Sequence, residues 1–245
     1  MIRTWMVLVL ICCLPLTSLA VVGRNIYTHP ANKGVVLYPN VDRILIIGDG
    51  LVSHHQVGRS RSLEETLARF LRMAGYVDTQ VVSIAEPKLN SSAARLKMPS
   101  ILEYYKPSIV IMALGYEDVI RQEKLKSSMQ LMDEMLTQLK KAKIRILLVG
   151  VKPPEDAFPF YKEKLPQVYQ YLASKHQIPL YPELRAGLSE ENGMLMKDKI
   201  HPSPKGVRFI AQQLQPTIEA MLEKLYEDRR FSEQESFYSE EIELP

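Results

Sequence analysis

Two residues near the C-terminus have the chemistry of an acid–base pair. Asp198 and His201 lie three positions apart in residues 198–203 (DKIHPS). A carboxylate that orients an imidazole allows the ring to take a proton from water or from a hydroxyl group. Asp49 and Glu117 are two further carboxylates, each in a short polar segment that follows an apolar run. These four side chains are the candidates for chemistry if the fold brings them together.

Two kinds of chemistry follow from these residue types. His201, oriented by Asp198, would activate water directly, with Glu117 as a second acid or base. Alternatively, Asp49, Glu117 and His201 would converge on a divalent metal ion, because two carboxylates and one imidazole form a suitable ligand set. Spacing along the sequence does not distinguish the two, and we expect neither a metal nor another cofactor to be needed.

The elements that must position these groups alternate between buried strands and amphipathic helices. We expect strands at 43–47, 79–84, 108–114, 144–149 and 178–181. We expect helices at 62–74, 91–105, 124–141, 160–176 and 204–226, with Pro99 kinking or dividing the second of them. This alternation predicts an α/β protein: a three-layer α/β/α sandwich with a parallel sheet of about five strands.

The predicted sheet also indicates where a site would form. In open parallel sheets, ligands bind outside the carboxyl ends of the strands. The candidate positions are therefore those just after Ile47, Ile84, Leu114 and Val149. The loop before the closing helix, which carries His201, is expected to reach the same edge.

Composition and charge exclude some classes of function. The formal net charge is only +3, and no dense basic stripe with interleaved aromatic residues is present. We therefore expect no nucleic-acid partner. A small molecule is the expected partner, and the sequence carries no signal for an oligomeric state.

The two ends of the chain differ from the middle. Residues 1–20 combine Arg3, a short apolar run and small residues up to Ala20, which is the layout of a secretory signal peptide. Both cysteines of the chain lie inside this segment, so a disulfide-free protein exported to a bacterial periplasm or secreted is expected, without a stable membrane span after processing. We expect a surface leader over 21–42, one domain over 43–226 and a disordered acidic tail over 227–245.

Three segments together resemble a known family. Residues 48–51 (GDGL), 114–118 (LGYED) and 198–203 (DKIHPS) occur in the order and at the strand ends seen in the SGNH/GDSL hydrolases, in particular the bacterial thioesterase I/arylesterase subgroup. The resemblance spans residues 43–225. It implies the SGNH hydrolase fold, which is flavodoxin-like, and ester hydrolysis as the activity of the family.

The resemblance also assigns roles to individual positions. Gly50 stands where the family has its nucleophilic serine, and Glu117 stands where an asparagine donates to the oxyanion. Ala85 is the expected match for a glycine that supplies a backbone N–H to the same oxyanion. Asp198 and His201 match the family's acid and base. Acyl transfer needs a nucleophile, a base and oxyanion donors, and two of these three parts are altered here.

We therefore expect a catalytically impaired homologue that binds an acyl or glycan ligand. The alternative is a divergent ester hydrolase in which Asp198 and His201 activate water. Some residues also have structural interpretations. Asp49 is expected to bond the backbone N–H groups of neighbouring loops, Gly50 to allow a tight turn, and the Asp198–His201 pair to hold its loop against the sheet. Ser53 is disfavoured as a substitute nucleophile, and His54 and His55 are expected at the surface or pocket rim.

Overall fold

A single parallel sheet forms the centre of the molecule. The computed structural model describes residues 36–55 and 57–242. Within them the strands are β1 (Asp42–Gly48), β2 (Thr79–Ser83), β3 (Ile109–Ala113), β4 (Arg145–Val149) and β5 (Leu180–Tyr181). They are all parallel and lie in the order β2-β1-β3-β4-β5. The predicted α/β fold with a parallel sheet of about five strands is confirmed.

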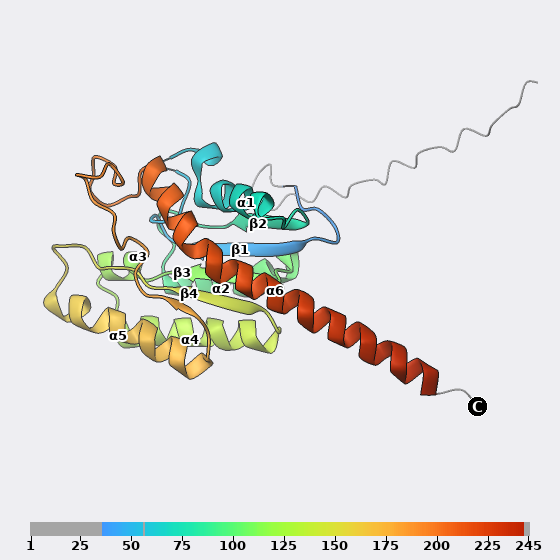
Figure 1. The fold of residues 1–245 in the computed structure, drawn as a ribbon. Coiled ribbons are helices and arrows are strands. Elements are labelled where there is room, and N and C mark those ends of the chain that lie inside the picture. Colours follow the sequence, from blue (N-terminus) through green and yellow to red (C-terminus); the bar gives the residue numbers. More distant parts are fainter. Residues whose placement is uncertain (1–35, 56, 243–245) are drawn as a thin grey trace, which may run out of the picture.

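Two layers of helices cover the sheet (Figure 1). The helices are α1 (Leu63–Met73), α2 (Ser91–Tyr105), α3 (Tyr116–Ile120), α4 (Leu125–Lys141), α5 (Pro159–His176) and α6 (Pro204–Ile242), with a short 3-10 turn, η1 (Arg59–Arg61). α1 packs against α6 on one face, and α2, α4 and α5 pack together on the other. A three-layer α/β/α arrangement results.

The strands form where the chain is apolar on both faces. Every residue of β1 is buried, and Ile44 to Ile47 are fully inaccessible to solvent. β1 pairs with β2 and β3, so that Ile46 lies between Ser83 and Ile111. Because both faces of β1 are buried, its sequence is a continuous apolar run rather than an alternation of apolar and polar residues.

Side-chain caps mark where the helices begin. Ser62 Oγ accepts a hydrogen bond from the backbone N–H of Glu65 at the start of α1, and Asn90 Oδ1 accepts one from Ala93 N at the start of α2. Pro99, which we expected to kink or divide the second helix, does not divide α2. Proline removes only one backbone hydrogen bond, and the buried side chains of α2 hold the helix against the core.

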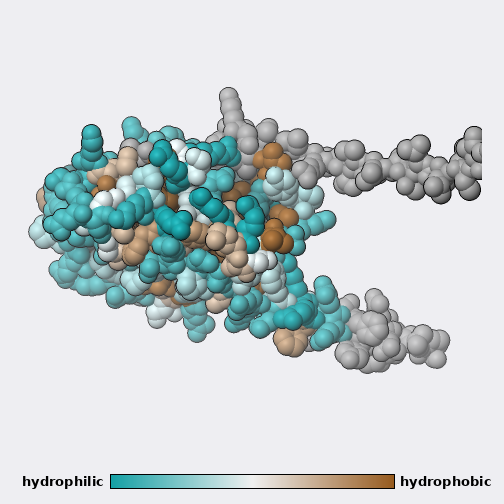
Figure 2. Space-filling model, turned by 45° about the horizontal axis from the view of Figure 1, so that its top comes forward, coloured by the Kyte–Doolittle hydropathy of each residue, from teal (hydrophilic) through white to brown (hydrophobic). Residues whose placement is uncertain are grey.

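α6 is longer than the sequence analysis predicted. We expected the helix to end at Tyr226 and a disordered tail to follow, but α6 continues to Ile242. Between Pro216 and the end of α6 the chain contains neither proline nor glycine, so nothing in the backbone stops the helix. The extension projects from the body (Figure 1), and its described surface is mostly hydrophilic (Figure 2).

Two ion pairs fasten the beginning of this extension to the sheet. Arg229 donates through both guanidinium nitrogens to the buried carboxylate of Asp42, at 2.9 and 2.5 Å. Asp228 pairs with Arg145 at 2.7 Å. These contacts extend the helix beyond the last apolar residue of the core, and a sequence pattern based on apolar periodicity does not register them.

The end of the expected surface leader is partly buried. Of residues 21–42, the structure describes 36–42, and within them Leu37 is only 8% exposed and Asp42 already belongs to β1. The expected signal peptide, 1–20, lies outside the described residues. No helix in the described part of the chain is long and apolar enough to cross a membrane.

Candidate functional site

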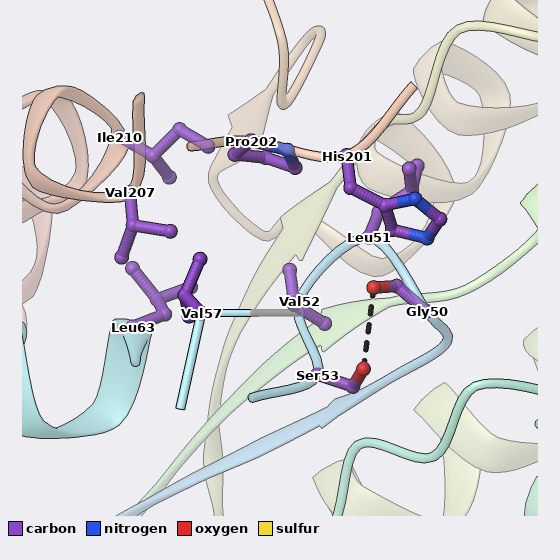
Figure 3. Close-up of a pocket in the computed structure, with 10 residues that line it drawn as sticks. All are labelled: Gly50, Leu51, Val52, Ser53, Val57, Leu63, His201, Pro202, Val207 and Ile210. Atoms are coloured by element: carbon purple, nitrogen blue, oxygen red, sulfur yellow. Dashed lines mark hydrogen bonds between the residues drawn. The ribbon is translucent and has the colours of Figure 1, made fainter. Parts of the chain in front are cut away.

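Gly50 and His201 meet at the carboxyl edge of the sheet. Gly50 follows β1, and His201 lies in the loop before α6 (Figure 3). A Cβ built on Gly50 would lie 3.2 Å from His201 Nε2 and 3.3 Å from the carbonyl oxygen of Pro87. The loops expected at one edge are therefore together, and the imidazole of His201 and the carbonyl group of Pro87 lie so close to Gly50 that a side chain there would fit only tightly.

Asp198 and His201 form the expected pair. His201 Nδ1 lies 2.7 Å from Asp198 Oδ2, while Asp198 Oδ1 accepts the backbone N–H groups of Ile200 and His201 at 2.9 and 3.0 Å. Partial burial acts to raise the pKa of Asp198, but these hydrogen bonds outweigh it and hold the pKa below its ordinary value. A neutral imidazole that donates Nδ1–H to the carboxylate presents Nε2 as an acceptor towards Gly50.

Arg185 holds the loop that carries this pair, and the sequence analysis did not identify it. One NH group donates to the carbonyl of Ile200, the residue before His201, at 2.9 Å. Another donates to the carbonyl of Lys152 at 3.4 Å, and the guanidinium carbon lies 5.8 Å from the centre of the Tyr116 ring. Arg185 thereby links the His201 loop to the loops after β3 and β4. No local motif signals this role.

Asp49 joins two loops from a fully buried position. Its Oδ1 accepts the N–H of Leu51, and its Oδ2 accepts those of Tyr116 and Glu117, at 3.1, 3.1 and 3.4 Å. Burial raises the pKa of Asp49 to about 7, although the three backbone N–H groups act in the opposite direction. The contacts agree with the expected structural role, because both oxygens are directed at backbone groups of the two loops.

Glu117 lies in the first turn of α3 and is engaged by Arg121. Arg121 Nε lies 2.9 Å from Glu117 Oε1, and another guanidinium nitrogen donates to the carbonyl of Lys88 at 3.1 Å. The Glu117 side chain is 14% exposed, whereas that of Arg121 is 42% exposed. An ion pair between Glu117 and Arg121 therefore stands at the position where the resemblance implies an oxyanion donor.

The expected backbone donor at Ala85 is bonded to another residue of its own loop. Ala85 N–H lies 3.2 Å from Ser83 Oγ and donates to it. Pro87, two residues further on, is the member of this loop that lies against Gly50. Proline has no backbone N–H, so at this position the loop presents a carbonyl oxygen and no donor.

An apolar pocket opens beside Gly50 and His201. About 330 Å³ of it is not occupied by atoms, a volume that includes open solvent. The lining residues come from the loop after β1, the start of α1 and the start of α6 (Figure 3): Gly50, Leu51, Val52, Ser53, Val57, Leu63, His201, Pro202, Val207 and Ile210. Most are aliphatic, so the pocket suits an apolar group with a polar end near His201.

The remaining sequence candidates have other surroundings. Ser53 Oγ is buried and donates to the carbonyl of Gly50 at 3.3 Å, so this hydroxyl is directed at the backbone. The rings of His54 and His55 stack with their centres 5.0 Å apart. Among the described residues, no group of three or more His, Cys, Asp or Glu side chains is arranged to hold a metal ion. The alternative of a metal site formed by Asp49, Glu117 and His201 is therefore not supported.

Comparison with known proteins places this arrangement in context. Residues 46–209 match the GDSL-like Lipase/Acylhydrolase family. Esterase TesA of Pseudomonas aeruginosa is 25% identical over 179 residues, which cover 73% of this chain and 89% of that protein. The Escherichia coli protein named thioesterase 1/protease 1/lysophospholipase L1 is 25% identical over 181 residues, covering 72% and 85%.

Solved structures show the same fold. A crystal structure of TesA superposes with a TM-score of 0.69 at 24% identity, covering 74% of this chain and 99% of that chain. The psychrotrophic esterase EstA from Pseudoalteromonas has the same TM-score at 18% identity, with coverage of 74% and 99%. These structures show that the chain has the same overall fold as the two esterases.

Proposed function

Because the chain belongs to the GDSL-like lipase/acylhydrolase family, we propose that it is an exported member that binds an acyl or glycan ligand and has little or no esterase activity. The absence of a side chain at Gly50, opposite His201, carries this proposal. His201 Nε2 lies 3.2 Å from a Cβ position that Gly50 does not fill. The base therefore faces a stretch of backbone where the family resemblance implies a hydroxyl group, and an acyl-enzyme cannot form at glycine.

The groups around Gly50 support the same proposal. An ester oxygen that becomes negative needs hydrogen-bond donors aimed at it. Pro87 offers a carbonyl oxygen, and Glu117 is a carboxylate paired with Arg121. Loss of one oxyanion donor typically costs about 3–4 kcal/mol of transition-state stabilisation. Two altered donors and an absent nucleophile together argue against two-step ester hydrolysis.

The aliphatic lining of the pocket supports the acyl class of ligand over the glycan class. Leu51, Val52, Val57, Val207 and Ile210 present carbon atoms only, whereas sugars need convergent polar groups. An acyl chain bound here would place its polar end beside Gly50 and His201. The site would thus still bind ligands, although it lacks the nucleophile and the oxyanion donors that ester cleavage needs.

A second candidate is direct water activation. The 2.7 Å contact between Asp198 and His201 keeps the imidazole oriented, and Nε2 would take a proton from a water molecule that reaches it from the pocket. The protein would then be a divergent ester hydrolase without a covalent intermediate. Both candidate functions use the same site, so a measurement of esterase activity distinguishes them.

Turnover of an aryl acetate by wild type and by His201→Ala tests the two candidates. We expect both proteins to match the buffer rate, since the nucleophile is missing. Enzyme-like turnover in wild type that disappears in His201→Ala would reject the impaired-homologue proposal and establish water activation instead. Circular dichroism of both proteins serves as the control for folding.

Export is part of the proposal and rests on residues 1–20. The lone Arg3, the short apolar run and the small residues before Val21 support cleavage after Ala20. Mass spectrometry of protein from a bacterial periplasmic fraction should find a chain beginning at Val21. An intact N-terminus in the membrane fraction would instead indicate an uncleaved anchor.

A further inference from the structure

Several exposed arginines on one helical layer have no carboxylate partner. We call them the arginine face, and they lie on η1, on α1 and in the first turns of α6: Arg59, Arg61, Arg69, Arg72 and Arg208. All are exposed, and none forms an ion pair with another residue that the structure describes. Four arginines elsewhere each pair with a carboxylate at 2.5–2.9 Å: Arg95, Arg121, Arg145 and Arg229. The arginine face therefore carries positive charge that neighbouring carboxylates do not neutralise.

The side chains of the arginine face are neighbours in the fold. Arg69 and Arg72 are three positions apart on α1, so they project from one side of that helix. The guanidinium carbon of Arg208 lies 5.0 Å from the centre of the Phe70 ring, which places this α6 side chain against α1. η1, which carries the other two arginines, ends two positions before α1 begins. Residues from three elements thus form one cationic surface.

Few negative charges lie on these elements. α1 has two carboxylates, of which Glu65 is exposed and Glu64 is buried, and the first turn of α6 adds a further cation, Lys205. Like charges three positions apart on a helix destabilise it, so Arg69 and Arg72 oppose each other. Their mutual repulsion would be relieved by an anionic partner outside the chain.

Apolar groups accompany the arginines. Met73 follows Arg72 and is 80% exposed, the highest value among the large apolar side chains that the structure describes. Leu63 at the start of α1 and Val207 beside Arg208 line the aliphatic pocket (Figure 3). Guanidinium groups bind phosphates well, and a lipid bilayer offers phosphates directly above hydrocarbon. A nucleic acid would supply phosphates but no apolar layer for Met73.

We infer that the arginine face docks the protein on an anionic lipid bilayer, with the guanidinium groups at the lipid phosphates and Met73 at the boundary of the acyl chains. The pocket between the starts of α1 and α6 would then lie close to the bilayer. The inference goes beyond the proposed function, and it rests on that function only in making the bilayer the source of the acyl ligand.

Co-sedimentation of the mature protein with vesicles tests the docking. We expect binding to phosphatidylglycerol vesicles that weakens as salt is added, and little binding to phosphatidylcholine vesicles. Arg69→Gln with Arg72→Gln should weaken binding about 25-fold, since each basic residue at an anionic surface contributes about fivefold. Met73→Gln should weaken it about fivefold through lost apolar burial. Equal binding to both kinds of vesicle would overturn the inference.

A matched double variant on the other helical layer is the control. Lys126→Gln with Lys141→Gln removes the same charge from α4, which lies across the sheet from α1 and α6 (Figure 1). Binding should stay nearly unchanged, because charges more than about 10 Å from the bilayer are largely screened. An equal loss in both double variants would show that net charge alone acts, and would overturn the inference. Tighter binding of a DNA duplex than of phosphatidylglycerol vesicles would also overturn it.

A plug in the pocket separates the docking from the proposed function. Val207→Trp should abolish binding of octanoate in solution and leave vesicle binding unchanged. Leu51→Trp repeats the plug from the loop after β1, in case the first variant does not fold. Octanoate binding without vesicle binding would overturn the docking and leave the proposed function in place. Vesicle binding without octanoate binding would support the docking and refute the acyl ligand.

Discussion

Restoration of esterase activity should require three substitutions together. Gly50→Ser would supply the nucleophile, Glu117→Asn a side-chain donor and Pro87→Gly a backbone N–H. A Cβ at Gly50 would contact both His201 Nε2 and Pro87 O, and the Glu117 N–H donates to Asp49, the residue before Gly50. Because a nucleophile and its oxyanion donors act as a unit, single substitutions should gain little.

The expected magnitude follows from the donors. Each oxyanion donor is typically worth about 10²–10³ in turnover rate. Relative to Gly50→Ser alone, the triple variant should therefore gain about 10⁴-fold or more, and each double variant that keeps Gly50→Ser about 10²-fold. The serine fits tightly, because its Cβ would lie 3.2 Å from His201 Nε2 and 3.3 Å from Pro87 O. Pro87→Gly also relieves this contact by loosening the loop.

The assay is turnover of an aryl acetate by wild type, the three single variants, the doubles and the triple variant. The triple variant carrying His201→Ala is the control, and it should return to the buffer rate. A triple variant no better than Gly50→Ser would refute the reasoning that missing donors limit the reaction. It would mean instead that the site has changed more widely than at these three positions.

Three further predictions concern stability. In the unfolded chain Asp49 loses its proton near the ordinary pKa of 3.8, whereas in the folded chain it keeps the proton up to a pKa of about 7. The free energy of unfolding should therefore fall by about 1.4 kcal/mol per pH unit as pH rises between those two values. Chemical denaturation at several pH values should show this slope, and Asp49→Asn should remove it. Arg185→Met should lower the free energy of unfolding by about 1–3 kcal/mol, because the loop before His201 loses its hydrogen bonds to Arg185. Arg185→Lys should be destabilised as well, since lysine cannot reach both carbonyl groups. Unchanged denaturation midpoints would refute the role of Arg185 in holding this loop. Truncation after Tyr226 should lower the free energy of unfolding by about 1–2 kcal/mol, because the buried Asp42 loses its partner Arg229; the loss is limited because Arg229 is partly exposed. A truncated chain as stable as wild type in thermal unfolding would show that the extension contributes nothing.

The sequence by itself determined the architecture and the position of the site. Continuous apolar runs such as 44–47 can be buried only between two helical layers, and their carboxyl ends must share one edge. The convergence of Gly50 with Asp198 and His201 follows from that topology together with the family resemblance. Both depend on periodicity and element order, which a sequence displays directly.

Other features depended on contacts between distant segments, so only the tertiary structure decided them. Whether Ala85 or Pro87 faces Gly50 is set by the path of the irregular loop after β2, which has no periodicity to read. The role of Arg185 depends on reaching carbonyl groups in two other loops. The length of α6 depends on the ion pair between Arg229 and Asp42, which lies 187 positions earlier in the chain. From composition alone, this acidic segment resembles a disordered tail, because the sequence does not show which distant charges it will pair with.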